Sequence, residues 1–251
     1  MNELGLTNTV SLVTGASGGI GQAIAKTLSD AGSSVAIGYH SNESGAKRTL
    51  VSCGKNSMVV QGDVSDPAEC RRMIDRVIEK YGRVDILVNN AAIGIKDSFE
   101  MPYEAWLTQW KATLDANLMS AVNMTFCSAP FMKKQGSGKI INISSRSAFR
   151  GETEYMAYAA SKAAMVNFTR CVARTLAKDN IQTYAVAPGF IGAGMGIEEI
   201  ARHGQEIRSQ IPSGKIGTAQ DVANVVLFLA SGLSDYLTGS TIDVNGGSYL
   251  H

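Results

Sequence analysis

Short apolar runs and longer stretches with helical periodicity alternate along the chain. Short runs rich in valine and isoleucine predict seven buried strands: Val10–Thr14, Ser34–Tyr39, Ser57–Gln61, Ile86–Asn89, Lys139–Ser144, Gln182–Ala187 and Thr241–Val244. Longer stretches with helical periodicity lie between them, near residues 20–31, 43–53, 67–81, 103–134, 155–178 and 219–231. Strands that alternate with helices in this way predict an α/β fold, a doubly wound parallel sheet with helices on both faces. No Pro- or Gly-rich linker and no repeat interrupts the pattern, so we expect a single domain over residues 1–251.

Residues 189–217 are the least regular part of the chain, because they are rich in glycine and show no clear period. Irregular segments of this length either cover a functional site or form plain surface loops. Both alternatives, a mobile lid and a surface loop, stay open from the sequence.

Composition narrows the possible partners. The chain has 45% hydrophobic and 18% charged residues and a net charge of +1, which argues against a basic nucleic-acid surface. No signal segment opens it, and its apolar stretch Val222–Ala230 is too short to span a bilayer, so we expect a soluble, cytoplasmic protein without a membrane partner. Four cysteines without CxxC spacing and three scattered histidines predict reduced structural thiols and no metal site.

The first chemical signal is the run TGASGGIG at residues 14–21, between the first predicted strand and the first predicted helix. A helix N-terminus carries unpaired N–H groups and attracts phosphate. Gly15 allows the tight turn, Gly19 lets a pyrophosphate approach the backbone, and Gly21 lets the helix pack close to the strand. The run therefore predicts a dinucleotide site on a Rossmann-type sheet.

The end of the second predicted strand bears on which dinucleotide binds. It reads GYHSN, and no carboxylate follows until Glu43. An Asp or Glu at this place usually holds the ribose 2′-hydroxyl of NAD. His40, Ser41 and Asn42 can instead donate hydrogen bonds to the 2′-phosphate of NADP. The sequence favours NADP(H), and NAD(H) stays possible because no Arg or Lys precedes Lys47.

A second signal is the pair Tyr158 and Lys162, which share one face of a predicted helix. A nearby ammonium favours the phenolate and is expected to lower the pKa of Tyr158 from its usual value near 10. The strand before this helix ends in Ser144 and Ser145, and either hydroxyl can polarise a carbonyl held against Tyr158. These residues predict acid–base chemistry on a carbonyl or alcohol.

With these motifs in place, residues 5–249 resemble the short-chain dehydrogenase/reductase family. TGASGGIG resembles its TGxxxGxG loop, Asp63 in GDV its adenine-contacting Asp, and Asn89-Asn90-Ala91-Ala92 its NNAG segment. Asn117 in DANL resembles the catalytic Asn, Tyr158-x-x-x-Lys162 the active-site pair, and PGFI the segment beside the nicotinamide. The family's catalytic Ser lies thirteen residues before the Tyr, which selects Ser145. Tyr155 has no Lys four residues on, so it forms a pocket wall or simple packing.

The resemblance implies a catalytic set and a cofactor site. Hydride would pass between the nicotinamide and a substrate carbon, with Tyr158 as acid or base, Lys162 lowering its pKa, Ser145 orienting the oxygen and Asn117 holding a water. The implied cofactor-binding residues are Gly15, Ser17, Gly18, Gly19, Ile20, Gly21, His40, Ser41, Asn42, Asp63, Val64, Asn90, Ala91, Ala92, Tyr158, Lys162, Pro188, Gly189 and Ile191.

Three positions depart from the family pattern. Ala193 stands where a Thr usually contacts the nicotinamide, and Gly18 stands where NADP-dependent members often have Arg or Lys. The C-terminal stretch from Ile211 resembles 3-oxoacyl-[acyl-carrier-protein] reductases, yet Asp179 stands where those enzymes present a basic residue to the acidic carrier protein. Lys133 and Lys134 are possible compensating cations.

The first function hypothesis is an NADPH-dependent reductase of 3-oxoacyl thioesters, with acyl carrier protein as a possible partner in fatty acid synthesis. The alternative substrate is a small ketone, sugar or polyol. Two other classes are a nucleotide-sensing regulatory protein and a lyase or epimerase on the same scaffold. Phe149, Met195 and Ile197 predict a partly apolar pocket. Apolar residues such as Val166, Phe168, Cys171 and Val172 lie on two faces of the helices, which predicts one face against the sheet and one against a partner helix. The resemblance to the family implies that the assembly is a homotetramer.

Overall fold

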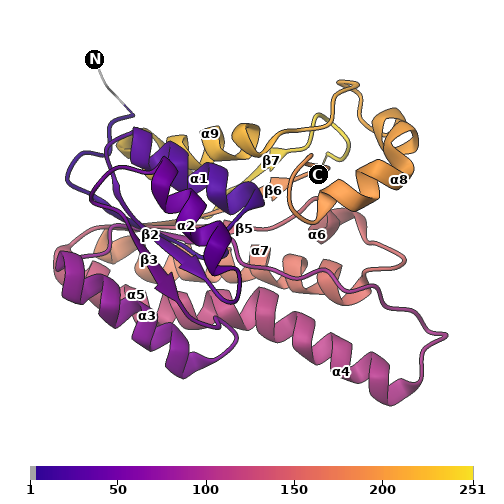
Figure 1. Ribbon diagram of the computed structural model, residues 1–251, viewed down its shortest axis with the longest axis horizontal. Helices are drawn as coiled ribbons and strands as arrows, with labels where there is room; N and C mark the ends of the chain where they lie inside the picture. Colours follow the sequence, from indigo (N-terminus) through magenta and orange to yellow (C-terminus); the bar gives the residue numbers. More distant parts are fainter. Residues whose placement is uncertain (1–3, 251) are drawn as a thin grey trace.

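Seven parallel strands form one sheet in the computed structural model, which describes residues 4–250 (Figure 1). The strands are β1 Val10–Val13, β2 Ser34–Tyr39, β3 Met58–Gln61, β4 Ile86–Asn89, β5 Gly138–Ile143, β6 Ile181–Pro188 and β7 Thr241–Val244. Their order is β3-β2-β1-β4-β5-β6-β7. The order reverses between β1 and β4, and a crevice at the carboxyl ends of these strands is where such sheets bind ligands. The predicted fold class is confirmed; residues 1–3 and 251 of the expected domain lie outside the described residues.

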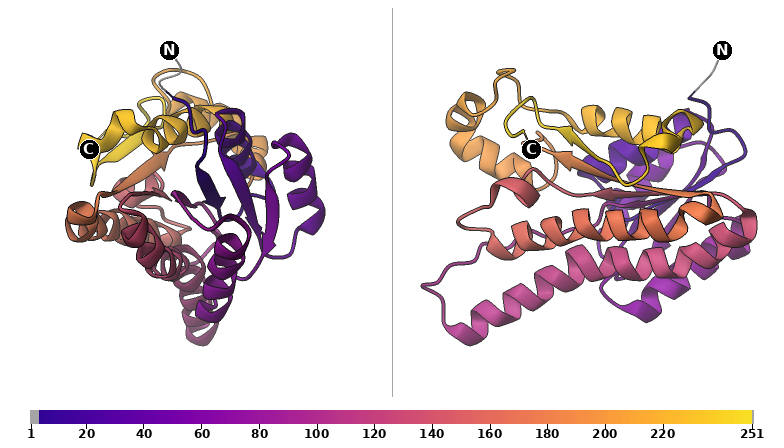
Figure 2. Two further views of the ribbon diagram at one scale, coloured as in Figure 1. Left: turned by 90° about the vertical axis from the view of Figure 1, so that its left-hand side faces the viewer. Right: turned by 180° about the vertical axis from the view of Figure 1, so that it is seen from behind.

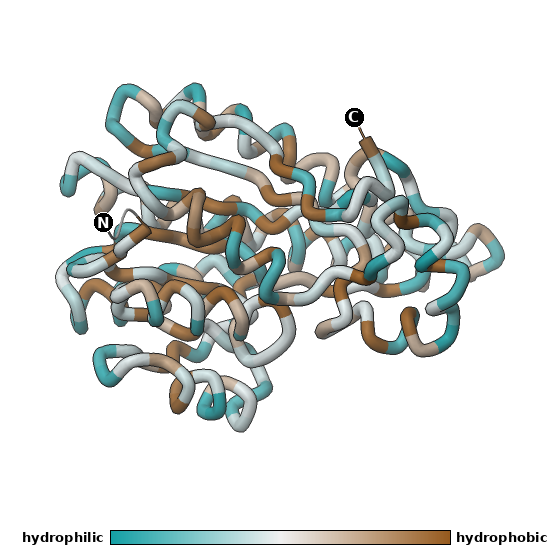
Figure 3. The backbone as a smooth tube through the Cα atoms, turned by 90° about the horizontal axis from the view of Figure 1, so that it is seen from above, coloured by the Kyte–Doolittle hydropathy of each residue, from teal (hydrophilic) through white to brown (hydrophobic). Residues whose placement is uncertain are grey.

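Helices cover both faces of the sheet (Figures 1 and 2). One face packs against α1 Gly19–Asp30, α2 Glu43–Ser52 and α9 Ala219–Ala230, and the other against α3 Pro67–Tyr81, α5 Ser120–Gln135 and α7 Met156–Leu176. α4 Tyr103–Leu114 lies along α7. Two apolar cores result, one on each side of the strands, and Figure 3 shows hydrophobic stretches of the chain in the middle of the molecule. Burial on both faces explains why the strands read as continuous apolar runs.

Two predicted helices differ in detail from the observed ones. The stretch 103–134 is divided into α4 and α5 by a wider π-helical turn, Asp115–Met119, and α7 ends in the 3-10 turn Ala177–Asp179. Val166 and Val172 are buried in the monomer, and Phe168 packs against the same core. Cys171, the fourth apolar residue named on this helix, is exposed.

The prediction of an irregular segment at 189–217 is wrong over residues Gly196–Ser209, which form helix α8. Glycines at 192, 194, 196 and 204 hide the helical period, and only Ile207 on the helix is buried. Charged side chains one turn apart, such as Glu198 and Arg202, line its exposed face. α8 lies at the same end of the molecule as the short helix α6, Ser147–Arg150, and the C-terminal segment (Figure 1).

Candidate active site

The turn after β1 is held by backbone contacts that leave no room for side chains. Gly15 has φ 64°, and a Cβ there would lie 2.8 Å from the Cα of Ala91. A Cβ on Gly21 would lie 2.5 Å from both Asn90 Nδ2 and the Gly15 carbonyl oxygen. Asn90 Nδ2 donates to the Thr14 carbonyl at 2.9 Å, and the Asn90 and Ala91 amides donate to Thr14 Oγ1. The sequence motifs around 14–21 and 89–92 therefore form one rigid unit across β1 and β4.

The N-terminus of α1 has the properties of a phosphate site. Gly18 precedes the helix, and no side chain caps it, so the first N–H groups point outward without a capping partner. A Cβ on Gly18 would meet nothing within 4 Å, whereas one on Gly19 would lie 3.2 Å from the Cα of Gly194. Ser17 lies half-buried in the same turn and Ile20 packs against the core below it. These residues fit the pyrophosphate of a dinucleotide.

The ends of β2 and β3 lie beside this turn and bring His40 and Asp63 together. His40 Nε2 lies 3.9 Å from Asp63 Oδ2, and Ser65 donates its backbone N–H and its hydroxyl to Asp63 Oδ1. Burial opposes ionisation of Asp63, but the Ser65 hydrogen bonds and His40 hold the pKa of its carboxyl below its usual value. Ionised Asp63 can accept hydrogen bonds from the amino group of an adenine.

The remaining residues expected around the adenine ribose have separate surroundings. Ser41 is exposed, and Asn42 caps α2, where its Oδ1 accepts from the Gly45 amide at 3.0 Å. Only the amide nitrogen of Asn42 stays available as a donor to a ligand. Val64 packs against the core with its side chain, which leaves its backbone as the part that can face a nucleotide.

Tyr158 and Lys162 both lie on α7, and burial controls their titration. Lys162 is 2% exposed, donates from Nζ to the Ile143 carbonyl at 2.8 Å, and lies with Nζ 5.6 Å from the centre of the Tyr158 ring. Burial lowers the pKa of Lys162 to about 7. Burial also raises the pKa of the Tyr158 phenol, which the hydrogen bond with Ser145 only partly offsets. The pKa of Tyr158 is therefore raised and not lowered as expected, because burial of the phenol has the largest effect and the Glu152 charge adds to it.

Three serines near the end of β5 have three different partners. Ser144 Oγ donates to the Lys162 carbonyl at 3.0 Å and so anchors α7 to the strand. Ser147 donates to Glu152 Oε1 at 2.8 Å. Ser145 accepts from the Ser147 amide and hydrogen-bonds the Tyr158 phenol, which lowers the pKa of that phenol. Ser145 is thus the serine that the fold brings to Tyr158, in agreement with the spacing argument.

Asn117 sits in the π-helical turn between α4 and α5 and is fully buried. Its Oδ1 accepts from the Ile93 amide at 2.8 Å, and its Nδ2 donates to the Ile93 carbonyl at 2.9 Å and to Ser161 Oγ at 3.1 Å. Ser161 lies next to Lys162 on α7. The side chain thus ties the irregular segment after β4 to the catalytic helix. Because both N–H groups of its amide are used, only acceptor positions, on Oδ1 and on the backbone carbonyl, are left to hold a water.

Asp97 has a role that the sequence did not reveal. Its carboxylate oxygens accept from the Met156 and Ala157 amides, both at 2.8 Å, and its side chain is almost fully buried. Asp97 therefore caps α7 from a loop 59 residues earlier in the chain. Tyr158 follows the second capped amide directly, so this cap fixes the start of the helix that carries the phenol. A cap from so distant a residue leaves no local sequence pattern.

The segment after β6 closes the crevice. The Pro188 carbonyl accepts from the Arg146 amide at 2.9 Å, and a Cβ on Gly189 would lie 2.8 Å from the Cβ of Asn245. Ile191 is buried in the core beside α9. A methyl on Gly94 would lie 3.5 Å from Met195 Sδ and 3.8 Å from the Tyr155 ring. Tyr155 and Met195 therefore both lie close to Gly94.

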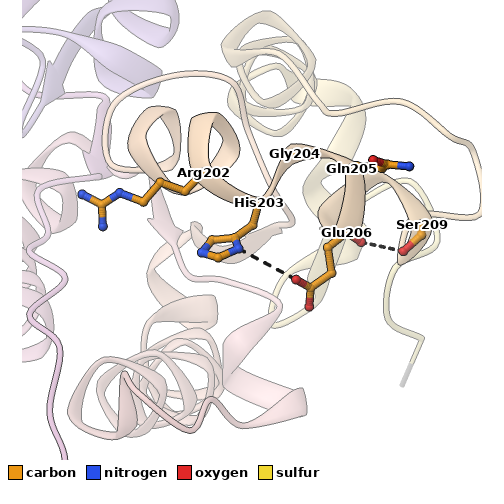
Figure 4. A pocket seen from close by; sticks show the side chains of 6 residues that line it. All are labelled: Arg202, His203, Gly204, Gln205, Glu206 and Ser209. Atoms are coloured by element: carbon orange, nitrogen blue, oxygen red, sulfur yellow. Dashed lines mark hydrogen bonds and ion pairs between the residues drawn. The ribbon is translucent and has the colours of Figure 1, made fainter.

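A separate hollow of about 510 Å³ lies on α8, where the helix is kinked at His203 (Figure 4). It contains none of the predicted site residues and is open to solvent. His203 Nδ1 lies 3.9 Å from Glu206 Oε2 along its wall. Within residues 4–250, no group of three or more His, Cys, Asp or Glu side chains is placed to hold a metal. The hollow is a consequence of the kink.

Comparison with known proteins agrees with this geometry. A family model described as enoyl-(acyl carrier protein) reductase matches residues 15–249. The chain is 38% identical over 243 residues to "3-oxoacyl-[acyl-carrier-protein] reductase FabG" of Escherichia coli (strain K12), covering 96% of this chain and 97% of that protein.

The chain belongs to the short-chain dehydrogenase/reductase family.

Further relatives place it within this family of oxidoreductases. The protein of the same name from Staphylococcus aureus (strain Mu50) is also 38% identical and covers 96% of this chain and 98% of its own length. A solved structure described as a candidate short-chain alcohol dehydrogenase from Sinorhizobium meliloti 1021 has a TM-score of 0.91 at 31% identity and covers 98% of both chains. The two descriptions differ in substrate and agree in chemistry, an oxidoreductase acting on a carbonyl or hydroxyl group.

As a short-chain dehydrogenase/reductase, this chain departs from the family motif after β6 for a visible reason. Ala193 and Gly194 lie against the turn before α1, and Gly194 has φ 57°. Small residues allow this approach of two backbones. At the other end of α7, Lys133 Nζ lies 3.2 Å from Asp179 Oδ2. Lys133 is therefore neutralised by Asp179 and does not compensate for it as a free basic residue.

Proposed function

We propose that this protein is an NAD(P)H-dependent carbonyl reductase in which Tyr158 is the acid. The observation that carries the proposal is the convergence of Tyr158, Ser145 and Lys162 at the carboxyl end of β5, beside a turn built for phosphate. A bound nicotinamide supplies the hydride. The nucleotide-sensing alternative has less support, because both Tyr158 and Lys162 are present and positioned.

The residues of the chain perform the proton chemistry. Ser145 holds the substrate oxygen next to the Tyr158 hydroxyl, and that hydroxyl delivers a proton as the carbonyl is reduced. A raised pKa keeps the phenol protonated at neutral pH, so Tyr158 is a competent acid there and a weak base. Lys162 holds the nicotinamide ribose, and the backbone carbonyl of Asn117 holds the water that returns a proton. This arrangement favours reduction near neutral pH and alcohol oxidation at higher pH.

NADP(H) is the proposed cofactor, and NAD(H) is the alternative. No carboxylate at the end of β2 faces the ribose position, since Glu43 pairs with Lys47 at 2.7 Å. His40 is exposed and can donate a ring N–H to a 2′-phosphate, and its Nε2 lies 3.9 Å from Asp63 Oδ2.

Two substrate classes are supported by different observations. A 3-oxoacyl thioester is favoured by the relatives of that name, at 38% identity over nearly the full chain. A small ketone, sugar or polyol is favoured by the structural neighbour and by the Lys133–Asp179 pair, which removes a basic docking point for an acidic carrier protein.

We further propose a homotetramer that works in the cytoplasm. Large apolar side chains are exposed along α4 and α5, among them Tyr103 at 67% and Phe126 at 70%. Burial of such a surface between copies is favourable. The cysteines are unpaired, as in a reducing compartment, and no helix within residues 4–250 has the length and hydropathy to cross a membrane. Light scattering at micromolar concentration tests the assembly, and a monomeric mass contradicts it.

The test of the function follows nicotinamide absorbance with NADPH, and separately NADH, and acetoacetyl thioester or a panel of small ketones. Oxidation of NADPH that depends on the carbonyl supports the proposal, and the preferred substrate decides between the two classes. Nucleotide binding without turnover of any carbonyl contradicts it and favours the regulatory alternative.

The matched variant is Tyr158→Phe. It removes the proton donor and leaves the half-buried ring, so we expect kcat to fall by about 10²–10⁴-fold. The dissociation constant of the nucleotide, measured by fluorescence titration, should change little because the phosphate turn is untouched. Substantial turnover in Tyr158→Phe would show that another group supplies the proton.

A further inference from the structure

Glu152 is a carboxylate close to the catalytic residues that the proposed reaction leaves unused. It lies in the short loop that joins α6 to α7 (Figure 1). On one side of Glu152, the Gly151 amide donates to the Ser147 carbonyl at 3.3 Å. On the other side, the Asp97 amide donates to the Glu154 carbonyl at 2.9 Å. The backbone that carries Glu152 is therefore anchored directly before the catalytic helix.

The side chain of Glu152 is connected to the catalytic serine through Ser147. The Ser147 amide donates to Ser145 Oγ at 3.1 Å, and Ser147 Oγ donates to Glu152 Oε1 at 2.8 Å. Ser147 is only 8% exposed, so these bonds hold the carboxylate in one place. Ser145 also hydrogen-bonds the Tyr158 phenol. The carboxylate, the serine and the phenol therefore belong to one hydrogen-bonded cluster.

One oxygen of this carboxylate is free to bind a ligand. Glu152 is half-buried, and its Oε2 makes no hydrogen bond and is not sealed from solvent. Within residues 4–250, no Lys, Arg or His lies in ion-pair range of Glu152, whereas Glu154 in the same loop pairs with Lys96 at 2.9 Å. A carboxylate oxygen has only acceptor positions, so Oε2 can bind an O–H or N–H group of a ligand.

The surroundings of Glu152 favour a neutral hydroxyl as that group. The negative charge of Glu152 repels a carboxylate on the substrate. Arg146 follows Ser145 directly and acts electrostatically on Glu152, which opposes a cationic group in the same place. A 3-oxoacyl thioester has no O–H or N–H group next to its keto carbon. Because only Ser147 separates Glu152 from Ser145, the hydroxyl must lie close to the carbonyl that Ser145 holds.

We propose that Glu152 binds a hydroxyl next to the keto group of the substrate, so that the site reduces small hydroxyketones to vicinal diols. This inference rests on the proposed reductase function and selects the sugar and polyol class within it. In the reaction, the keto carbon gains one hydride from NAD(P)H, which is oxidised to NAD(P)⁺, and the keto oxygen gains one proton from Tyr158. The substrate hydroxyl keeps its hydrogen, which points to Glu152 Oε2 throughout.

The test compares hydroxyacetone with methoxyacetone. Both ketones carry an oxygen on the same carbon, but only hydroxyacetone has an O–H group to donate. The measured quantity is the ratio of kcat/KM for hydroxyacetone to kcat/KM for methoxyacetone. Glu152→Gln keeps the size of the side chain and one oxygen for Ser147, but it replaces the acceptor Oε2 by an NH₂ group. We therefore expect Glu152→Gln to lower this ratio by about 10-fold or more.

Glu154→Gln is the matched control. Glu154 carries the same charge in the same loop, but its side chain is 64% exposed and pairs with Lys96. Loss of a surface ion pair has little effect, so the ratio should stay within about 2-fold of wild type. A merely structural role of Glu152 would lower kcat/KM for both ketones together and would leave the ratio unchanged.

A binding measurement separates this inference from the proposed function. If neither ketone is reduced, saturation-transfer NMR of hydroxyacetone with the full chain and NADP⁺ detects contact with the site directly. Hydroxyacetone should then give a signal that Glu152→Gln removes and that Glu154→Gln keeps. If Glu152→Gln does not fold, Glu152→Ala takes its place, with the same fall in the ratio expected.

The outcomes are distinct. Turnover with the same ratio in wild type and Glu152→Gln overturns the inference and leaves the reductase function standing. Absence of turnover together with hydroxyacetone binding that depends on Glu152 overturns the function and supports the hydroxyl site. Absence of both turnover and binding in wild type overturns the inference and the function together.

Discussion

The two halves of the active-site crevice are built by different means. The phosphate turn after β1 is closely packed, with glycines where a Cβ would collide, as at Gly15 and Gly21. The catalytic helix α7 is held by side chains from elsewhere: Asp97 caps its start, and Asn117 and Ser144 bond its second turn. The first half tolerates no added atom at Gly15 or Gly21, and the second depends on a few polar atoms. Each half should therefore fail under a different kind of substitution.

The largest effect on the phosphate turn is expected from Gly21→Ala. Its methyl would overlap Asn90 Nδ2 and the Gly15 carbonyl, and overpacking of this kind costs about 1–3 kcal/mol. Displacement of Asn90 would also disturb the first turn of α1, so nucleotide affinity should fall with stability. Urea unfolding and nucleotide titration measure both.

Gly18→Ala is the matched control for that comparison. A methyl at Gly18 would meet no atom within 4 Å, and the φ of 176° there is extended backbone open to any residue. The free energy of unfolding should stay within about 0.5 kcal/mol of wild type. Equal destabilisation by Gly18→Ala and Gly21→Ala would mean that the contacts at Gly21 do not hold the turn.

For the catalytic half, Asp97→Ala is the sharpest test. It removes the cap of α7 and leaves two buried amides unpaired, which costs about 1–3 kcal/mol in the free energy of unfolding. Because Tyr158 is misplaced while the phosphate turn is intact, kcat should fall more than nucleotide affinity.

Asp97→Asn tests whether this cap acts by positioning. The amide keeps one acceptor, so part of the stability and of kcat should return. A fall of nucleotide affinity in proportion to kcat in Asp97→Ala would show that the two halves are not independent.

The smallest predicted effect concerns a proton on Lys162. Its pKa of about 7 in the folded protein lies below the ordinary value of 10.5. Between these pH values the unfolded chain binds more protons than the folded protein, so the free energy of unfolding rises with pH from about 7 to 10.5. Below pH 7 the buried Lys162 charge destabilises the folded protein by its full amount. Lys162→Met should therefore raise the melting temperature most at pH 6 and progressively less at pH 8 and 9. An increase in melting temperature that is the same at every pH would contradict the lowered pKa of Lys162.

The same comparison explains what the sequence could predict. The order of strands and helices follows from apolar periods, and the phosphate turn follows from glycine spacing, because both are local constraints. The partners of Ser144, Ser145 and Ser147 depend on where α7 packs, which no local pattern contains. The pKa of Tyr158 was expected to fall because only charge was considered; burial, which needs the fold, has the larger effect. Asp97 was missed because a cap from a distant residue is recognisable only in three dimensions.

The π-helical turn at Asp115–Met119 limits which insertions and deletions this part of the chain can accept in evolution. Such a turn is an α-helix with one extra residue, and one residue corresponds to about 100° of rotation around the helix axis. Deletion of a single residue within it would restore an unbroken helix and swing Asn117 away from Ile93. The side chains of α5 would then present a different face to the sheet than they do now. The helical segment can therefore accept substitutions, but an insertion or deletion of one residue between Tyr103 and Gln135 would displace Asn117 or the buried face of α5.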